Sequence, residues 1–123
     1  MKVLIIGAAG MIGRKLTARL VRDGRLAGKT IDQAHLVDVV APQPLKNAPF
    51  PAVLDAFDIA APYVAPKLIA ARPDVIFLLA SVVSGEAEAD FDKGYRINLD
   101  GTRMLFDAIR LAGGGYKPRI VFT

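Results

Sequence analysis

The stretch GAAGMIG, residues 7–13, carries three glycines spaced three residues apart, Gly7, Gly10 and Gly13. It follows the apolar run KVLII, residues 2–6, and precedes a basic segment whose apolar residues recur at helical spacing. A strand that leads directly into a helix leaves unpaired N–H groups at the positive end of the helix dipole, where a phosphate binds well. Gly7 would permit the tight turn, Gly10 would leave room for a pyrophosphate, and Gly13 would let the helix pack closely. The stretch therefore predicts a phosphate-binding loop after a buried strand.

Strand-like runs alternate with helix-like segments along the whole chain. The expected strands are residues 2–6, 34–40, 52–58, 74–80 and 119–123, and the expected helices run from about 12 to 23, 62 to 71 and 90 to 112. Residues 23–30 and 41–51 are expected to be loops, the glycines at 113–115 to end the last helix, and the regular part of the second helix to begin near Pro66. This alternation predicts an α/β fold, a Rossmann-like doubly wound parallel sheet with strand order 3-2-1-4-5. A ligand would bind at the carboxyl ends of the first and fourth strands, where the strand order reverses.

Composition limits the function classes. The 123 residues are enough for one domain, 53% are hydrophobic, and there is no Cys, which excludes disulfides, thiolate zinc sites and cysteine nucleophiles. The longest uncharged stretches fall well short of the roughly 20 residues that a membrane-spanning helix needs. A net charge of +4 raises the alternative of nucleic-acid binding, but the basic residues are scattered and favour a solvated helix face. The single histidine, His35, is expected to be a strand residue with a satisfied ring nitrogen, and no metal site is expected.

An acidic residue lies near the end of the second expected strand. Asp38 is placed where a carboxylate would accept hydrogen bonds from an adenosine ribose, and it would repel a 2′-phosphate, which favours NAD over NADP. The alternative is a strand-end carboxylate without a ligand. A nucleoside-triphosphate loop is rejected, because Gly13 is followed by Arg14 and Lys15 instead of Lys and Ser or Thr.

The spacing Gly-x-x-Gly-x-x-Gly resembles the extended short-chain dehydrogenase/reductase superfamily, the NAD-dependent epimerase/dehydratase group, and the resemblance covers the whole chain. Residues 84–102, SGEAEADFDKGYRINLDGT, are similar to its D-erythronate dehydrogenase branch, which oxidises a four-carbon sugar acid. Three positions depart from the family pattern: Ile6 replaces a Thr or Ser, Leu78 a His, and Ser81 an Ala.

The resemblance implies a set of NAD-binding residues. Asp58 and Ile59 would contact the adenine, and the stretch from Leu79 to Ser81 would pass beneath the cofactor. The full set is Gly7, Gly10, Met11, Ile12, Gly13, Asp38, Asp58, Ile59, Leu79, Ala80, Ser81 and Asn98. Ser84 and Glu86 could contact a sugar-acid substrate, with solvated loop side chains as the alternative.

No catalytic residue is assigned. The family's proton transfer depends on a Tyr-x-x-x-Lys helix beyond the fifth strand. Tyr63 and Lys67 match that spacing, but they precede the fourth strand and enclose Pro66.

These observations predict that residues 1–123 form the NAD-binding portion of an NAD-dependent oxidoreductase of a reducing cytoplasm that acts on a sugar acid. The catalytic and substrate portion is expected beyond Thr123, so the chain alone is expected to be inactive. A homo-oligomer is possible, and no nucleic-acid or membrane partner is expected. The alternatives are a non-catalytic dinucleotide-binding or sensor module, supported by the uncovered apolar edge of the fifth strand, and a sugar-nucleotide epimerase or dehydratase.

Overall fold

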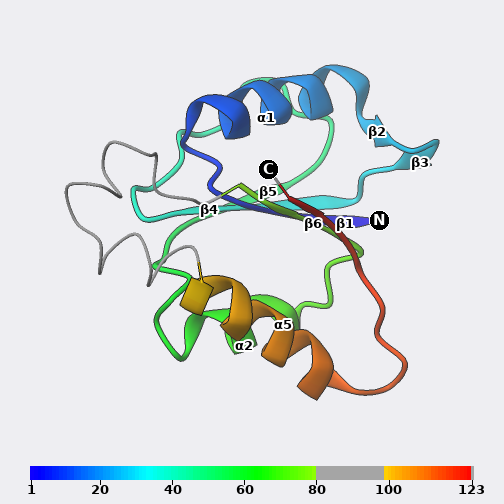
Figure 1. Ribbon diagram of the computed structural model, residues 1–123. Coiled ribbons are helices and arrows are strands. Elements are labelled where there is room, and N and C mark those ends of the chain that lie inside the picture. Colours follow the sequence, from blue (N-terminus) through cyan, green and yellow to red (C-terminus); the bar gives the residue numbers. More distant parts are fainter. Residues whose placement is uncertain (80–98, 123) are drawn as a thin grey trace. The chain divides into compact units, whose positions relative to one another are not determined.

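The computed structural model describes residues 1–79 and 99–122 of the chain (Figure 1). A five-stranded sheet has the order β5-β4-β1-β6-β7, and every neighbouring pair is parallel. Its strands are β1 (Lys2–Ile6), β4 (Gln33–Asp38), β5 (Ala52–Ala56), β6 (Val75–Leu78) and β7 (Arg119–Phe122). Because these are the first to fifth strands of the parallel sheet in chain order, the predicted doubly wound order 3-2-1-4-5 is confirmed.

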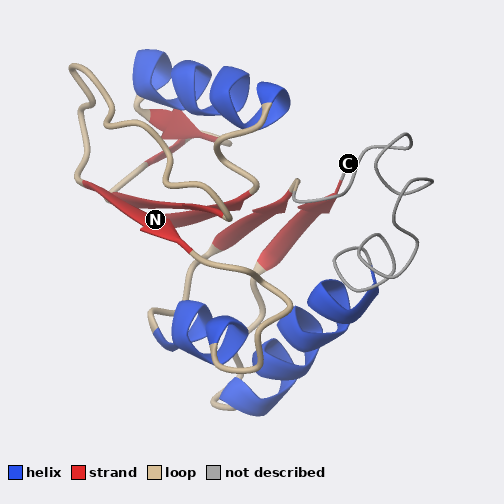
Figure 2. Cartoon of the chain, turned by 90° about the vertical axis from the view of Figure 1, so that its left-hand side faces the viewer, coloured by secondary structure: helices blue, strands red, loops and turns tan. Residues whose placement is uncertain are grey.

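The described residues form two compact units. The sheet unit contains Met1–Phe57, Pro73–Leu79 and 118–122, and includes the helix α1 (Met11–Asp23). The helix unit contains Asp58–Arg72 and 99–117, with the helices α2 (Val64–Ala70) and α5 (Gly101–Ala112). These two helices pack side by side (Figure 2).

Glycines follow two of the helices, and the sequence predicted the one that ends α5. Gly24, after α1, has a φ of 63° and donates its N–H to Leu20 O at 2.8 Å. Gly113, after α5, has a φ of 66°. Both values lie in the left-handed region, which a glycine adopts without a Cβ penalty.

One local prediction is wrong. Residues 23–30 do not form only a loop, because β2 (Arg25–Leu26) and β3 (Lys29–Thr30) make an antiparallel hairpin. Its two turn residues have φ values of 51° and 78°, and such a left-handed pair matches the twist of the flanking strands. The helix α2 begins at Val64, within the predicted range and two residues before Pro66, near which its regular part was predicted to begin. A proline is tolerated in the first turn, because the N–H group that it lacks would have no partner within the helix.

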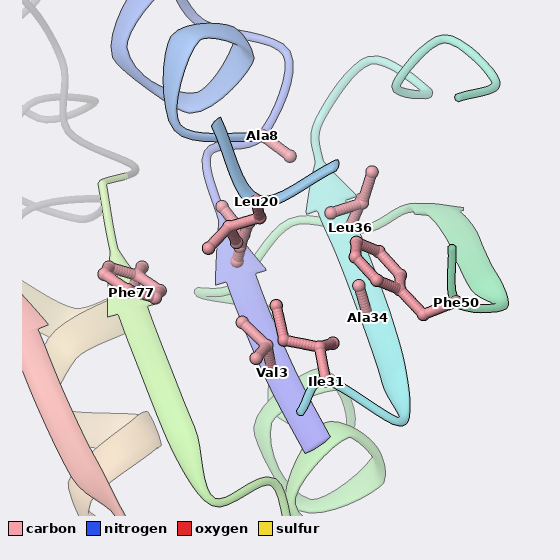
Figure 3. Packing of buried hydrophobic residues seen from close by; sticks show 9 residues of the cluster. Val3, Ala8, Leu20, Ile31, Ala34, Leu36, Phe50 and Phe77 are labelled. Carbon is pink, nitrogen blue, oxygen red and sulfur yellow. The ribbon is translucent and has the colours of Figure 1, made fainter. Parts of the chain in front are cut away.

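Strand β1 is buried on both faces, as its continuous apolar run predicted. Val3, Leu4, Ile5 and Ile6 are each at most 1% exposed. Val3 and Ile5 pack in a cluster with Leu20 of α1 (Figure 3). The other members of the cluster come from the strands and from the loops that border them: Ala8, Ile31, Ala34, Leu36, Phe50 and Phe77. Since a fully buried aliphatic side chain contributes about 1.5–3 kcal/mol, this cluster fixes α1 against the sheet.

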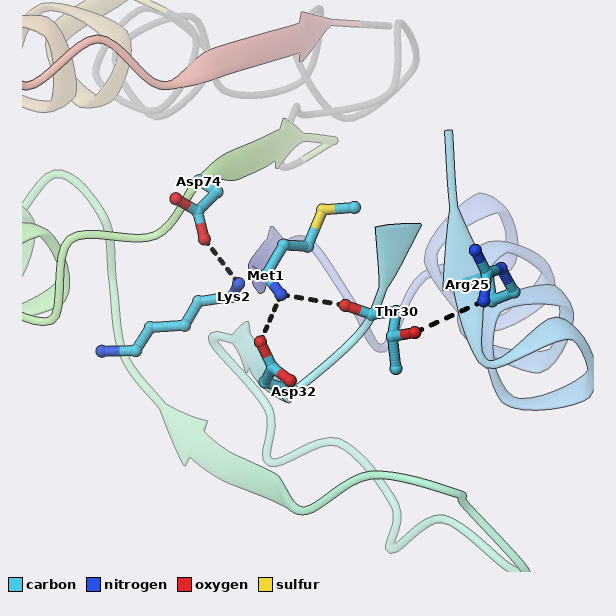
Figure 4. Close-up of polar contacts among 6 residues, drawn as sticks. All are labelled: Met1, Lys2, Arg25, Thr30, Asp32 and Asp74. Carbon is cyan, nitrogen blue, oxygen red and sulfur yellow. Dashed lines mark hydrogen bonds and ion pairs between the residues drawn. The ribbon is translucent and has the colours of Figure 1, made fainter. Parts of the chain in front are cut away.

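Polar contacts hold the amino end of β1 (Figure 4). The Lys2 N–H donates to Asp74 Oδ2 at 2.7 Å, and the Asp74 N–H donates to Lys2 O at 2.8 Å. The Met1 ammonium donates to the Asp32 carboxylate and to Thr30 O. These contacts fix the edge of the sheet opposite to the carboxyl ends of the strands.

His35 has a partner within the sheet. Its Nε2 lies 2.7 Å from Asp55 Oδ2 on the neighbouring strand, which confirms the expectation of a satisfied ring nitrogen. Within residues 1–79 and 99–122, no group of side chains could hold a metal ion, and none of the helices is both long and apolar enough to span a bilayer.

Candidate functional site: the glycine loop at the carboxyl edge of the sheet

The register of the sheet aligns three strand ends. Ile6 of β1 pairs with Val37 of β4 on one side and with Leu78 of β6 on the other. The next residue after Ile6 is Gly7, so the glycine loop, residues 7–10, leaves the sheet between these two strands. Strand order reverses there, and in doubly wound sheets ligands bind at this position.

Strand β4 holds the glycine loop by its backbone and by one side chain. Val37 O accepts the N–H groups of Gly7 and Ala8, at 2.8 Å and 3.1 Å. The Ala9 N–H donates to Asp38 Oδ2 at 2.9 Å, and the other carboxylate oxygen of Asp38 accepts the Val39 N–H at 2.7 Å. Three successive amides of the loop are therefore paired with two residues of one neighbouring strand.

The three glycines meet different surroundings. Gly7 has a φ of 98°, which strains any residue with a side chain. A Cβ on Gly13 would lie 2.2 Å from Gly7 O and 2.7 Å from Ala8 Cα, so no side chain fits there. A Cβ on the exposed Gly10 would come no closer than 3.6 Å to Gly7 O, and its φ of −73° suits any residue. The turn requires Gly7 and the packing requires Gly13, whereas no described part of the chain requires Gly10.

The first turn of α1 offers unpaired donors beside Gly10. The N–H groups of Met11, Ile12 and Gly13 have no acceptor within residues 1–79 and 99–122. The helix has no side-chain cap and no acidic residue in its first turn. Helix amides that lack a partner at the positive end of the dipole form a ready site for an anion.

A pocket of about 510 Å³ adjoins the loop within the sheet unit. Its walls are mostly apolar and come from the loop, one side of α1, Leu36, and residues 40–46. Arg14 and Lys46 also line it, and neither forms an ion pair with another residue of the described ranges. Arg14 was predicted to lie on a solvated helix face, and no role was predicted for Lys46. In the sequence, Arg14 directly follows the last glycine, and this position could have indicated that it lies beside the loop. The approach of Lys46 to the pocket depends on the fold.

Two of the predicted site residues lie in the helix unit. Asp58 Oδ1 accepts the Ala60 N–H at 2.9 Å. Ile59 is 4% exposed, and a Cβ on Gly101 would lie only 2.8 Å from its Cγ2. The Ile59 side chain is therefore packed against α5, which leaves its backbone as the part available to a ligand.

Leu79 directly follows β6 and is half-buried, and its N–H donates to Ile6 O at 2.8 Å. The predicted site residues Ala80, Ser81, Ser84, Glu86 and Asn98 lie outside the described residues.

The sequence matches a known protein family over nearly its whole length. Residues 3–123 match the model of the NAD dependent epimerase/dehydratase family, and the chain belongs to that family. Two curated relatives, both D-erythronate dehydrogenases, are 42% identical (Cupriavidus necator) and 34% identical (Haemophilus influenzae) over 100% of this chain. The chain spans 38% and 37% of their lengths.

Solved structures share the fold over nearly the whole chain. A nucleoside-diphosphate-sugar epimerase from Agrobacterium tumefaciens superposes with a TM-score of 0.95 at 61% identity, over 99% of this chain and 36% of its own. Uronate dehydrogenase from the same organism gives a TM-score of 0.74 at 27% identity, over 99% and 40%, and a mutant of that enzyme was solved with NAD.

Proposed function

We propose that the chain is the NAD-binding portion of an NAD-dependent oxidoreductase that acts on a sugar acid such as D-erythronate. The observation that carries the proposal is the contrast among the three glycines. The fold accounts for Gly7 and Gly13, while the open space at Gly10 adjoins the free amides of the first turn. A pyrophosphate that lies against the backbone at Gly10 would account for the third glycine.

Each part of the cofactor has residues that are proposed to bind it. The amides of Met11, Ile12 and Gly13 would bind the pyrophosphate, and Asp38 would accept hydrogen bonds from the adenosine ribose. By the family resemblance, Asp58 and the Ile59 backbone would contact the adenine. Leu79, Ala80, Ser81 and Asn98 would follow the rest of the dinucleotide. When bound, NAD supplies the hydride acceptor of the oxidation, and these residues bind and orient it.

The substrate class rests on the named relatives. Both curated relatives are D-erythronate dehydrogenases, and uronate dehydrogenase, a structural neighbour, also takes its name from a sugar acid. Ser84 and Glu86 are the proposed substrate contacts. The epimerase name of the structure that is 61% identical supports a second candidate, a sugar-nucleotide epimerase.

A cofactor titration tests the first half of the proposal. NADH is expected to bind more tightly than NADPH, measured by fluorescence of the reduced nicotinamide, because the Asp38 carboxylate repels a 2′-phosphate. Gly10→Val is expected to abolish binding of both, while the urea midpoint stays close to that of the unchanged chain. Equal affinities would refute the ribose assignment, and unchanged binding by Gly10→Val would refute the phosphate loop.

The substrate is tested on a protein that contains this chain at the full length of the curated relatives. Formation of NADH is expected with D-erythronate and absent with UDP-glucose. Interconversion of a UDP-sugar without net NADH formation would favour the epimerase instead. The chain of 123 residues alone is expected to bind NAD without turnover.

A further inference from the structure

We propose that Asp38 is a positioning residue for the glycine loop, and that its carboxylate fixes the Ala9 amide and with it the shape of the phosphate-binding turn. This role rests on the proposed function, and it deepens the part assigned to Asp38 as the ribose acceptor. One side chain would then have two separable effects, one on the loop and one on the choice of cofactor.

The contacts single out Asp38 from the rest of the sheet unit. Within the described residues, it supplies the only side-chain hydrogen bond to the backbone of residues 7–10. The remaining ties are from backbone to backbone: Gly7 and Ala8 to Val37 O, and Gly10 to Gly7 O at a longer 3.3 Å. Without Asp38, the half-buried Ala9 amide would have no acceptor in the described chain, and the turn would be anchored only at its start.

The position of Ala9 makes this tie important for a phosphate. Ala9 directly precedes Gly10, the residue whose carbonyl accepts the Arg14 N–H at 2.9 Å and begins α1. The helix itself supplies no side-chain cap at Gly10. An acceptor from another strand therefore fixes the backbone at Ala9, directly before the N-cap residue Gly10, and this backbone sets the direction of the three amides that have no acceptor within the described residues.

Two substitutions separate the hydrogen-bond acceptor from the charge. Asp38→Asn removes the charge but keeps one oxygen, which can accept the Ala9 N–H while water takes over the exposed Val39 amide. Asp38→Ala removes both the charge and the acceptor. If Asp38 acts only through the ribose and its charge, the two substitutions affect the binding of a ligand without ribose equally, because both remove the same charge.

Inorganic pyrophosphate is such a ligand, and its affinity can be followed by NMR through the amide signals of Met11, Ile12 and Gly13. Asp38→Ala is expected to weaken pyrophosphate binding by about tenfold or more, the change that accompanies loss of a hydrogen bond to a charged group. Asp38→Asn is expected to stay within about threefold of the unchanged chain, yet to lose the preference for NADH over NADPH, because discrimination follows the charge. Equal pyrophosphate affinity for Asp38→Ala and the unchanged chain would overturn the proposal.

Hydrogen exchange of the Ala9 amide tests the contact without any ligand. Exchange is expected to be about tenfold faster in Asp38→Ala and largely restored in Asp38→Asn. Asp55→Asn is the matched control: it removes a carboxylate from the neighbouring strand whose partner is His35, and it should change neither exchange at Ala9 nor pyrophosphate binding. Unchanged exchange at Ala9 in Asp38→Ala would refute the positioning role. Faster exchange in a chain that binds no pyrophosphate would support the positioning role and count against the proposed function.

Discussion

The same methyl group added to two glycines three residues apart should have opposite consequences. Gly13→Ala places a Cβ 2.2 Å from Gly7 O, 2.7 Å from Ala8 Cα and 2.8 Å from Ala8 C. All three are backbone atoms, which cannot rotate away. Restoring ordinary contact requires α1 and the turn to separate by about 1 Å, which opens the close-packed interior of the sheet unit.

The expected cost follows from two opposing terms. Overpacking of this kind costs about 3–4 kcal/mol, since the atoms in the way belong to the backbone. Alanine is about 1 kcal/mol better than glycine inside a helix. The net loss for Gly13→Ala is about 2–3 kcal/mol, which lowers Tm by about 10 °C at roughly 4 °C per kcal/mol.

Gly10→Ala is the matched control, because its Cβ meets nothing closer than 3.6 Å. Its stability should change by no more than about 1 kcal/mol, the difference between glycine and alanine at an N-cap. Under the proposed function, its methyl group points to the pyrophosphate, and NADH affinity should fall at least about tenfold. Circular dichroism during urea unfolding gives the stability of each variant, and an NADH titration gives the affinity of each. A stable Gly13→Ala, or an unstable Gly10→Ala, would refute this division of roles.

Three further predictions concern stability and titration. Gly24→Ala should lower the free energy of unfolding by about 1 kcal/mol in urea, because alanine is strained at a φ of 63°. Leu105→Ala, at a fully buried position of α5, should cost about 2–5 kcal/mol in the same assay, and a smaller loss would contradict the observed burial. Hydrogen bonds from Arg19 and then Arg22 lower the pKa of Asp23 below its usual 3.8, so this carboxylate stabilises the fold above its unfolded-state pKa, and the contribution is lost as the pH falls through the lower folded-state value. An NMR titration of the Asp23 carboxyl in Arg19→Gln should show a higher pKa, and no change would contradict the assigned cause.

The strands were predictable where apolar side chains are continuous or end at a turn signal. Strand β1 was predicted with its observed bounds, whereas β4 ends at Asp38 and the exposed Val39 and Val40 follow it. The β2–β3 hairpin could not be read from the sequence, because its strands are two residues long and its turn places an alanine at positive φ. The hairpin that this turn closes stabilises the positive φ of the alanine, and an alanine in the sequence does not predict such a turn.

Part of the candidate site was likewise predictable from the sequence, and part depends on the fold. The glycine spacing predicted the turn and the close packing of α1, because the backbone requires a glycine at Gly7 and at Gly13, whereas the role of Gly10 stays a prediction. The pairing of Ala9 with Asp38, and the approach of Lys46 to the pocket, join residues 29 or more positions apart. Both depend on the parallel register of β1 and β4, which sequence periodicity does not specify to the residue.

The two roles proposed for Asp38 constrain how the cofactor preference could change. A replacement that removes the carboxylate would relieve the repulsion of a 2′-phosphate. The positive side chains of Arg14 and Lys46, which form no ion pair within the described residues, line the adjoining pocket. If the replacement also lacks an acceptor for the Ala9 amide, it would loosen the phosphate loop that both cofactors use. Asp38→Asn should therefore yield a chain that binds NADPH nearly as well as NADH, whereas Asp38→Ala should bind both poorly. Chains that prefer NADPH are expected to keep a hydrogen-bond acceptor at position 38 even after the charge there is lost.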